Sequence, residues 1–181
     1  MTEWREAPVS LFLLKTNCTQ SIRSPYNGSP TLNGVPMKNP LNPLLLDNQL
    51  CFALYSSSHL LTKVYKPLLK ELDLTYPQYL AMLALWEEDK VTVGALGEKL
   101  FLDSGTLTPL LKRMETAGLL ERARSGSDER QVFIELTDKG RALKRAAAQV
   151  PAKAAAATGL GVLELIKLRK QLTKLQAGLA G

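Results

Sequence analysis

The residue types best suited to chemistry in this chain are its two cysteines, Cys18 and Cys51. Cys51 follows Asp47, a good helix N-cap, and so falls in the second turn of an expected helix. The partial positive charge of a helix N-terminus favours the thiolate, which is the form that attacks electrophiles and is oxidised. Considered alone, Cys51 could instead be a small apolar side chain in a core. Cys18 could be an incidental thiol in a flexible tail.

Three tyrosines follow Cys51 at informative spacings. Tyr55 lies one turn after it, and Tyr65 lies two heptads after it, on the same helix face. Along a straight helix two heptads span about 21 Å, at ~1.5 Å per residue. Tyr65 could therefore contact Cys51 only from a second subunit, across first helices packed roughly antiparallel, and Tyr76 could reach the same pocket from that subunit. The alternative for each tyrosine is to fill an amphipathic core, with its hydroxyl at the edge.

Residues 102–118 have the sequence pattern of one helix, and polar residues stand at its start. Asp103 or Ser104 can cap it, Gly118 can end it, and an apolar stripe follows at helical spacing. Small hydroxyls in the first turns with cations behind them suit insertion into a DNA major groove. The alternative is an amphipathic helix with one solvated face. The candidate DNA contacts are Asp103, Ser104, Gly105, Thr106, Thr108, Lys112 and Arg113.

The flanks of this helix favour DNA binding. A short helix at 93–100 and a tight turn at 101–103 complete a helix-turn-helix. Strands at 119–124 and 130–136, joined by a turn, then predict a hairpin and thus a winged helix. An arginine at the tip of a wing suits a narrow minor groove, although a solvated hairpin is the alternative. The candidate wing contacts are Arg122, Arg124, Asp128 and Arg130.

The remaining elements are expected to be helices, so the fold class is mainly α with a small β-hairpin wing. Pro67 should kink or end the first helix, and a second runs from Thr75 to about Glu88. A helix at 137–158 should bend at Pro151, and a last helix at 162–179 carries a leucine stripe. We expect the first and last helices to pair with another copy of the chain. Core packing within one chain is the alternative.

Composition limits the class of protein. The chain has 181 residues, a hydrophobic content of 45% and a net charge of +6. Residues 137–181 hold nine Lys/Arg and two Asp/Glu, whereas residues 103–130 hold five of each, so DNA binding rests on arrangement and not on bulk charge. No apolar run approaches the ~18 residues of a membrane span or forms a signal-peptide core, which predicts a cytoplasmic protein. We expect no metal site, cofactor or disulfide framework.

Four segments follow from this survey. Residues 1–36 should be a disordered tail or should precede a true start at Met37. Residues 37–76 should form an N-terminal dimerisation and sensor helix, and residues 77–137 a DNA-binding winged helix. Residues 138–181 should form C-terminal dimerisation helices.

Several motifs resemble a known family. The sequence DER at 128–130 followed by IELT at 134–137 resembles the wing of the MarR family of dimeric winged-helix repressors. Within that family, four blocks resemble the organic hydroperoxide resistance regulators. They are LDNQLCFALY at 46–55, YKPLL at 65–69, LTYPQYL at 74–80 and LDSGTLTP at 102–109. The blocks agree in order and spacing, and the resemblance covers about residues 46–179.

This resemblance implies a thiol-based repressor that acts as a homodimer on double-stranded operator DNA. An organic hydroperoxide would oxidise Cys51, the dimer would release DNA, and a gene for hydroperoxide detoxification would be expressed. Tyr65 and Tyr76 of the second subunit would hydrogen-bond the sulfur, and Tyr55 would line the site. Some members carry a second cysteine near the C-terminal helices, but residues 154–159 contain none. The chain thus resembles the one-cysteine type, in which a small cellular thiol caps the oxidised sulfur.

Other functions fit parts of the sequence. A repressor of the same fold that responds to a phenolic ligand would leave Cys51 structural. A thiol peroxidase would use Cys51, but His59, the single histidine, lies about two turns away and no resolving cysteine is evident, so an enzyme is not expected. A pure dimerisation scaffold leaves the winged helix unexplained.

Overall fold

The computed structural model describes residues 31–32, 35–36, 42–124 and 132–180. The chain divides into two units, Met1–Leu50 and Cys51–Gly181. In the first, β1 (Thr31–Leu32) pairs antiparallel with β2 (Val35–Pro36), and a 3₁₀ helix, η2 (Leu46–Asn48), follows. The rest of the segment 1–36, for which we predicted disorder or a later start, lies outside the described residues.

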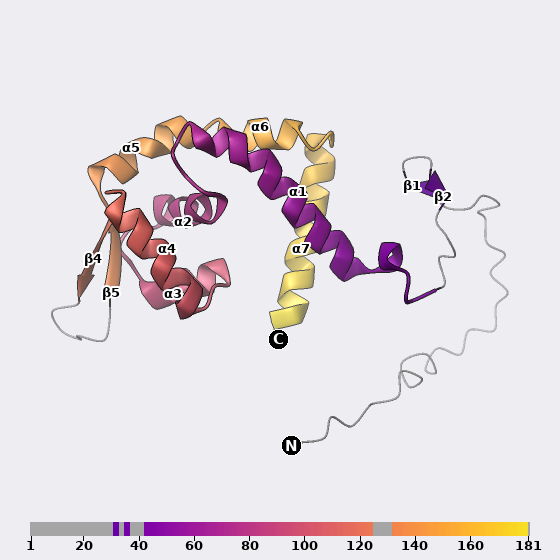
Figure 1. Ribbon diagram of the computed structural model, residues 1–181, viewed down its shortest axis with the longest axis horizontal. Helices are drawn as coiled ribbons and strands as arrows, with labels where there is room; N and C mark the ends of the chain where they lie inside the picture. The colour runs from indigo at the N-terminus through magenta and orange to yellow at the C-terminus, as the bar shows by residue number, and fades with distance from the viewer. Residues whose placement is uncertain (1–30, 33–34, 37–41, 125–131, 181) are drawn as a thin grey trace, which may run out of the picture. The chain divides into compact units, whose positions relative to one another are not determined.

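The helix that carries Cys51 is α1 (Leu50–Lys70), drawn in indigo to violet in Figure 1. One expectation about it was wrong. Asp47 lies inside η2, and the extended backbone of Gln49 separates η2 from α1, so Asp47 is not the N-cap and Cys51 lies in the first turn. Of the two effects predicted for Pro67, a kink or the end of the helix, the second does not occur, because the helix continues to Lys70 and its last turn packs on the core through the fully buried Leu69.

Three helices then build the centre of the second unit. They are α2 (Tyr76–Glu87), α3 (Val93–Leu100) and α4 (Ser104–Thr116), and each begins near its predicted residue. The start of α2 is fixed by Thr75, whose backbone N–H donates to Gln78 Oε1 at 2.8 Å. The apolar stripe predicted for α4 is buried and consists of Leu107, Leu110, Leu111 and Met114. After the helix, Gly118 adopts a left-handed φ of 68°.

A three-stranded antiparallel sheet packs beside these helices in the order β3-β5-β4. The predicted hairpin is present as β4 (Leu120–Arg124) and β5 (Val132–Leu136), with Arg122 opposite Ile134. The sequence analysis missed β3 (Val91–Thr92), which pairs Val91 with Ile134. Two residues are too few to show an alternating pattern, so β3 depends on its partner strand. The fold class predicted from the sequence is confirmed.

The C-terminal part consists of α5 (Asp138–Ala147), α6 (Val150–Ala156) and α7 (Val162–Ala180). We expected one helix bent at Pro151, but the break falls at Ala148 and Gln149, because a proline is best accommodated in the first turn of a new helix. Within the described residues, no helix is long and apolar enough to cross a membrane.

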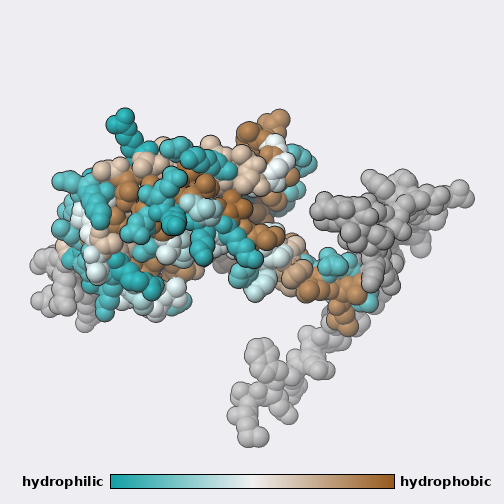
Figure 2. Space-filling view, turned by 45° about the horizontal axis from the view of Figure 1, so that its top comes forward, coloured by the Kyte–Doolittle hydropathy of each residue, from teal (hydrophilic) through white to brown (hydrophobic). Residues whose placement is uncertain are grey.

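Apolar side chains remain exposed on α1 and α7. On α1 they include Leu50 and Leu60, each 61% exposed, and on α7 Val162, Leu163 and Leu179. Figure 2 shows brown apolar residues open to solvent in several places on the face in view. The buried core lies instead between α2, α3, α4 and the sheet, with contributions from Leu69, Ala147 and Val150.

Candidate DNA-reading face and cysteine site

The opening turn of α4 presents the predicted DNA contacts. Asp103 is its N-cap, since Oδ1 accepts from the Thr106 N–H at 3.0 Å and Oδ2 accepts from the Thr106 hydroxyl at 2.9 Å. The Thr106 hydrogen bonds lower the pKa of Asp103 below its ordinary value. Both residues are therefore engaged with each other, and they order the turn from which Ser104 projects.

The side chains of this helix divide as a groove-reading helix requires. Leu107, Leu110, Leu111 and Met114 are buried. The opposite face holds the predicted contacts, of which Thr108 is half-buried and the others are exposed, namely Asp103, Ser104, Gly105, Thr106, Lys112 and Arg113. One helix thus meets the core with apolar residues and solvent with hydroxyls and cations.

The turn between α3 and α4 is tight. The Leu102 N–H donates to the Gly97 carbonyl at 2.9 Å. A Cβ at Gly97 would lie 2.9 Å from the Leu102 carbonyl oxygen and 3.4 Å from Leu107 Cδ2. Only glycine lets α3 approach the turn this closely, so Gly97 sets the angle at which α4 leaves it.

The predicted wing arginines have different positions. Arg122 faces α4, and its Nε and Nη2 lie 2.8 Å and 2.6 Å from Glu115 Oε2. This hydrogen bond lowers the pKa of Glu115. Arg122 therefore joins the wing to the recognition helix. The backbone of Arg124 pairs with that of Val132, the pair of the hairpin that directly flanks the connecting residues 125–131. Asp128 and Arg130 lie outside the described residues.

A cluster that the sequence analysis did not identify fastens the wing to the helices. Asp89 Oδ1 accepts from the Leu136 N–H of β5 at 2.9 Å, and its Oδ2 accepts from Arg141 Nη2 of α5 at 2.9 Å. Burial alone would raise the pKa of Asp89, but the bonds from Leu136 and Arg141 lower it. Arg141 also lies 3.3 Å from Glu135. No local sequence pattern indicates these contacts, because Asp89 and Arg141 are far apart in the chain.

Cys51 is exposed, near the start of α1. Tyr55, one turn later, is 63% exposed and stacks edge-on with His59 at a centroid distance of 4.3 Å. Because α1 is unbroken from Leu50 to Lys70, the rise of about 1.5 Å per residue keeps Tyr65 roughly 21 Å from Cys51 along its axis. A single chain does not bring them together.

Tyr65 belongs instead to a cluster of phenols at the far end of α1. Its ring centroid lies 4.9 Å from that of Tyr76 and 5.8 Å from that of Tyr79. Burial raises the pKa of all three, and the neighbouring phenols raise those of Tyr65 and Tyr79 further. All three are therefore neutral hydrogen-bond donors at physiological pH. The buried Tyr79 was not predicted, although it follows Tyr76 by one helical turn.

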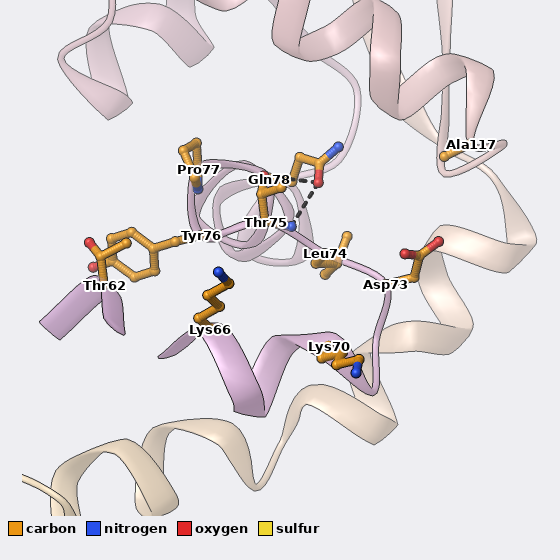
Figure 3. A pocket seen from close by; sticks show the side chains of 10 residues that line it. All are labelled: Thr62, Lys66, Lys70, Asp73, Leu74, Thr75, Tyr76, Pro77, Gln78 and Ala117. Atoms are coloured by element: carbon orange, nitrogen blue, oxygen red, sulfur yellow. Dashed lines mark hydrogen bonds between the residues drawn. The ribbon is translucent and has the colours of Figure 1, made fainter. Parts of the chain in front are cut away.

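A cavity of about 590 Å³ adjoins this cluster. It lies between the second half of α1, the loop after it and the N-terminus of α2, and Figure 3 shows Tyr76 beside Thr62 with Lys66 reaching toward α2. The sequence analysis predicted Tyr76 in a pocket with Cys51 of a second subunit, and it did not single out Thr62, Lys66 or Lys70. The cavity thus combines an aromatic wall, two cations and a helix N-terminus.

Comparisons with known proteins agree with this architecture. A family model described as transcriptional regulator SarA/Rot matches residues 63–147. The organic hydroperoxide resistance transcriptional regulator of Bacillus subtilis (strain 168) is 57% identical over 115 residues, which are 64% of this chain and 78% of that protein.

Solved structures of AbfR from Staphylococcus epidermidis are also similar. Reduced AbfR bound to DNA aligns with a TM-score of 0.62 and 38% identity, over 75% of this chain and 95% of that one. Disulfide-formed AbfR aligns with a TM-score of 0.51 and 40% identity, over 72% and 91% of the two chains. The relatives are transcriptional regulators and not enzymes. This chain therefore belongs to the MarR-type winged-helix transcriptional regulators, in the group of the organic hydroperoxide resistance regulators.

Proposed function

We propose that this regulator is a peroxide-sensing repressor in which Cys51 is the sensor. The reduced homodimer binds operator DNA through α4 and the wing, and oxidation by an organic hydroperoxide releases it. Contacts to DNA come from the exposed residues of α4 and from Arg124, Asp128 and Arg130, whereas Arg122 acts through its bond to Glu115. A repressor that binds operator DNA in this way would act in the cytoplasm.

One observation supports this proposal above the others. An exposed thiol and a cluster of neutral phenols lie at opposite ends of one continuous helix. Two such helices packed antiparallel would place each thiol of the dimer against the phenols of the other subunit. The exposed apolar side chains of α1 and α7 offer the surface for this pairing.

The chemistry then follows from the donors. Neutral phenols of Tyr65 and Tyr76 would donate to the Cys51 thiolate and stabilise it. The thiolate attacks the hydroperoxide, an S–O bond forms as the O–O bond breaks, an alcohol leaves and sulfenic acid remains. A small cellular thiol then displaces water and forms a mixed disulfide. This adduct is too large for the pocket and displaces a tyrosine.

The change would reach DNA through the shared helices. A shift of α1 moves Leu69 and with it the core of the winged helix, so the two α4 helices of the dimer no longer match successive major grooves. Two relatives are consistent with redox control. One is named for organic hydroperoxide resistance, and AbfR has been solved in a reduced, DNA-bound form and in a disulfide form.

The test is DNA binding by fluorescence anisotropy, with a duplex that spans the gene's own promoter. We would compare reduced protein, protein treated with cumene hydroperoxide and a small thiol, and Cys51→Ser treated alike. We expect the peroxide treatment to release DNA from the wild type and not from Cys51→Ser. If both proteins release DNA, or neither does, Cys51 is not the sensor.

The cavity beside Tyr76 favours a second candidate, a repressor that responds to a small phenolic ligand. Its volume of about 590 Å³ falls within the usual range for ligand pockets, and Lys66 and Lys70 could pair with an anionic group. In this case Cys51 is structural, so Cys51→Ser would keep its full response to the inducer.

A further inference from the structure

Phe101, in the turn between α3 and α4, has an unusual backbone for its residue type. It follows α3 as the C-cap with φ 55° and ψ 40°, in the left-handed region. Glycine or asparagine normally fills this position, because the Cβ of other residues is sterically unfavourable there. The capping hydrogen bonds come from the backbones of Phe101 and Leu102, so they do not require a phenyl ring.

The ring itself is also unfavourably placed for folding. It is 74% exposed and is not among the residues that pack on the core. Phe101 thus combines backbone strain with an exposed aromatic ring. Neither helix capping nor core packing accounts for both features at one residue.

The position of the ring points to a partner. Phe101 lines a hollow of about 560 Å³ together with Val93, Leu102, Asp103 and Ser104, so it lies beside the opening turn of α4. Figure 1 shows the start of α4 at the same, lower side of the winged helix as the ends of β4 and β5 that carry Arg124 and Val132. The ring is therefore continuous with the face that we assign to DNA.

We propose that Phe101 is a DNA-contacting residue whose ring packs on the deoxyribose groups at the edge of the major groove that receives α4. This inference rests on the DNA binding assigned above. The contact is apolar and displaces no counterion from phosphate. It therefore adds affinity that salt does not weaken, unlike the contacts from Lys112 and Arg113.

The experiment uses the full-length reduced protein, the promoter duplex and a scrambled duplex of equal length. Phe101→Asn and Phe101→Gly remove the ring and suit the left-handed backbone, whereas Phe101→Tyr keeps the ring. Loss of the ring, which the bound DNA would bury, should weaken the binding of Phe101→Asn and Phe101→Gly to both duplexes about tenfold or more. Phe101→Tyr should bind within about twofold of the wild type.

Two further measurements separate DNA contact from a structural role. The melting temperatures of Phe101→Asn and Phe101→Gly should equal or exceed that of the wild type, because the strain is relieved. Their slope of log K against log salt should stay unchanged, whereas Lys112→Ala should reduce it by about 0.9.

Several outcomes would overturn the inference. Unchanged affinity in Phe101→Asn would exclude the contact, and a lower melting temperature would assign the ring to stability. Weakening on the promoter duplex alone would place the ring on bases and not on deoxyribose. If wild-type protein binds neither duplex, the proposed function fails with it, whereas equal binding by wild type and variant leaves the proposed function intact.

Discussion

Arg122 of β4 and Glu115 of α4 form a close ion pair, with the guanidinium Nη2 2.6 Å from Glu115 Oε2. Both side chains are about one-third exposed, so the pair contributes no more than about 1 kcal/mol to folding. The ion pair mainly fixes a position, because it holds β4, the first strand of the wing, against the last turn of α4.

The first prediction concerns this pair. Arg122→Gln and Glu115→Gln should weaken operator binding to a similar extent, and the double variant should lose little more, because each single change removes the same interaction. Anisotropy titrations of the wild type, the two single variants and the double variant give the coupling free energy between Arg122 and Glu115. If Arg122 contacts phosphate instead, Arg122→Gln alone will weaken binding, and it will lower the salt slope.

The second prediction concerns Gly97. In Gly97→Ala the new Cβ would lie 2.9 Å from the Leu102 carbonyl, so the variant should lose about 1–3 kcal/mol of unfolding free energy. Gly94 in the same helix is the matched control, since its Cβ would meet only Thr92 Oγ1, at 3.9 Å. Gly94→Ala should be neutral or stabilising by up to about 1 kcal/mol. Urea denaturation measures both, and equal losses would contradict the close approach.

The third prediction is a pH dependence from Asp89. Its pKa is lowered in the folded state, so Asp89 stabilises the fold above its ordinary value of about 3.9, and this contribution is lost as pH falls through the lower, folded value. Asp89→Asn should cost about 1–3 kcal/mol at pH 7, and the difference from wild type should shrink as pH falls below about 4.

Denaturation midpoints at pH 7, 5 and 3 would test this dependence. Asp138→Asn serves as the control, because Asp138 also approaches Arg141, at 3.5 Å, but its side chain is fully exposed. If the difference in denaturation midpoint between wild type and Asp89→Asn stays constant with pH, the charge of Asp89 does not contribute to stability.

The fourth prediction tests whether the phenols act across the dimer. Loss of one charge-assisted hydrogen bond in Tyr65→Phe should slow oxidation of Cys51 about tenfold. In a heterodimer of Cys51→Ser and Tyr65→Phe subunits, the remaining Cys51 belongs to the subunit that lacks Tyr65. If the phenol comes from the partner, this thiol should oxidise at the wild-type rate.

Quenched-flow alkylation with mass spectrometry of the Cys51 peptide measures that rate. Co-expression with two different affinity tags yields the heterodimer. A heterodimer as slow as the Tyr65→Phe homodimer would show that the phenol and the thiol belong to one subunit.

Much of the fold could be predicted because local signals agree with the tertiary structure. Thr75, Asp103 and Thr137 each cap the helix that their sequence predicts, and the alternation after residue 130 identifies β5. The prediction was wrong at Asp47, where the same kind of capping residue lies in a 3₁₀ turn. A cap is a preference of the first turn alone and does not specify which of two adjacent helices will use it.

The candidate site was harder to predict. The spacing of Cys51 and Tyr65 along one helix was enough to suggest the antiparallel pairing of two subunits, since that argument depends only on helix geometry. The Arg122–Glu115 and Asp89–Arg141 pairs depend on the packing of strands against helices, and an exposed arginine on a hairpin has the same sequence pattern whether it faces solvent, DNA or a neighbouring helix.

The continuity of α1 has a mechanical consequence. The helix packs on the core near its C-terminal end, where Leu69 is fully buried, and it carries Cys51 near its N-terminal end. With a rise of about 1.5 Å per residue, the 18 steps between them make a lever of roughly 27 Å. Each degree of tilt about Leu69 moves the thiol end by about half an ångström. A sulfur substituent a few ångströms across therefore corresponds to a rotation of several degrees at the DNA-binding core.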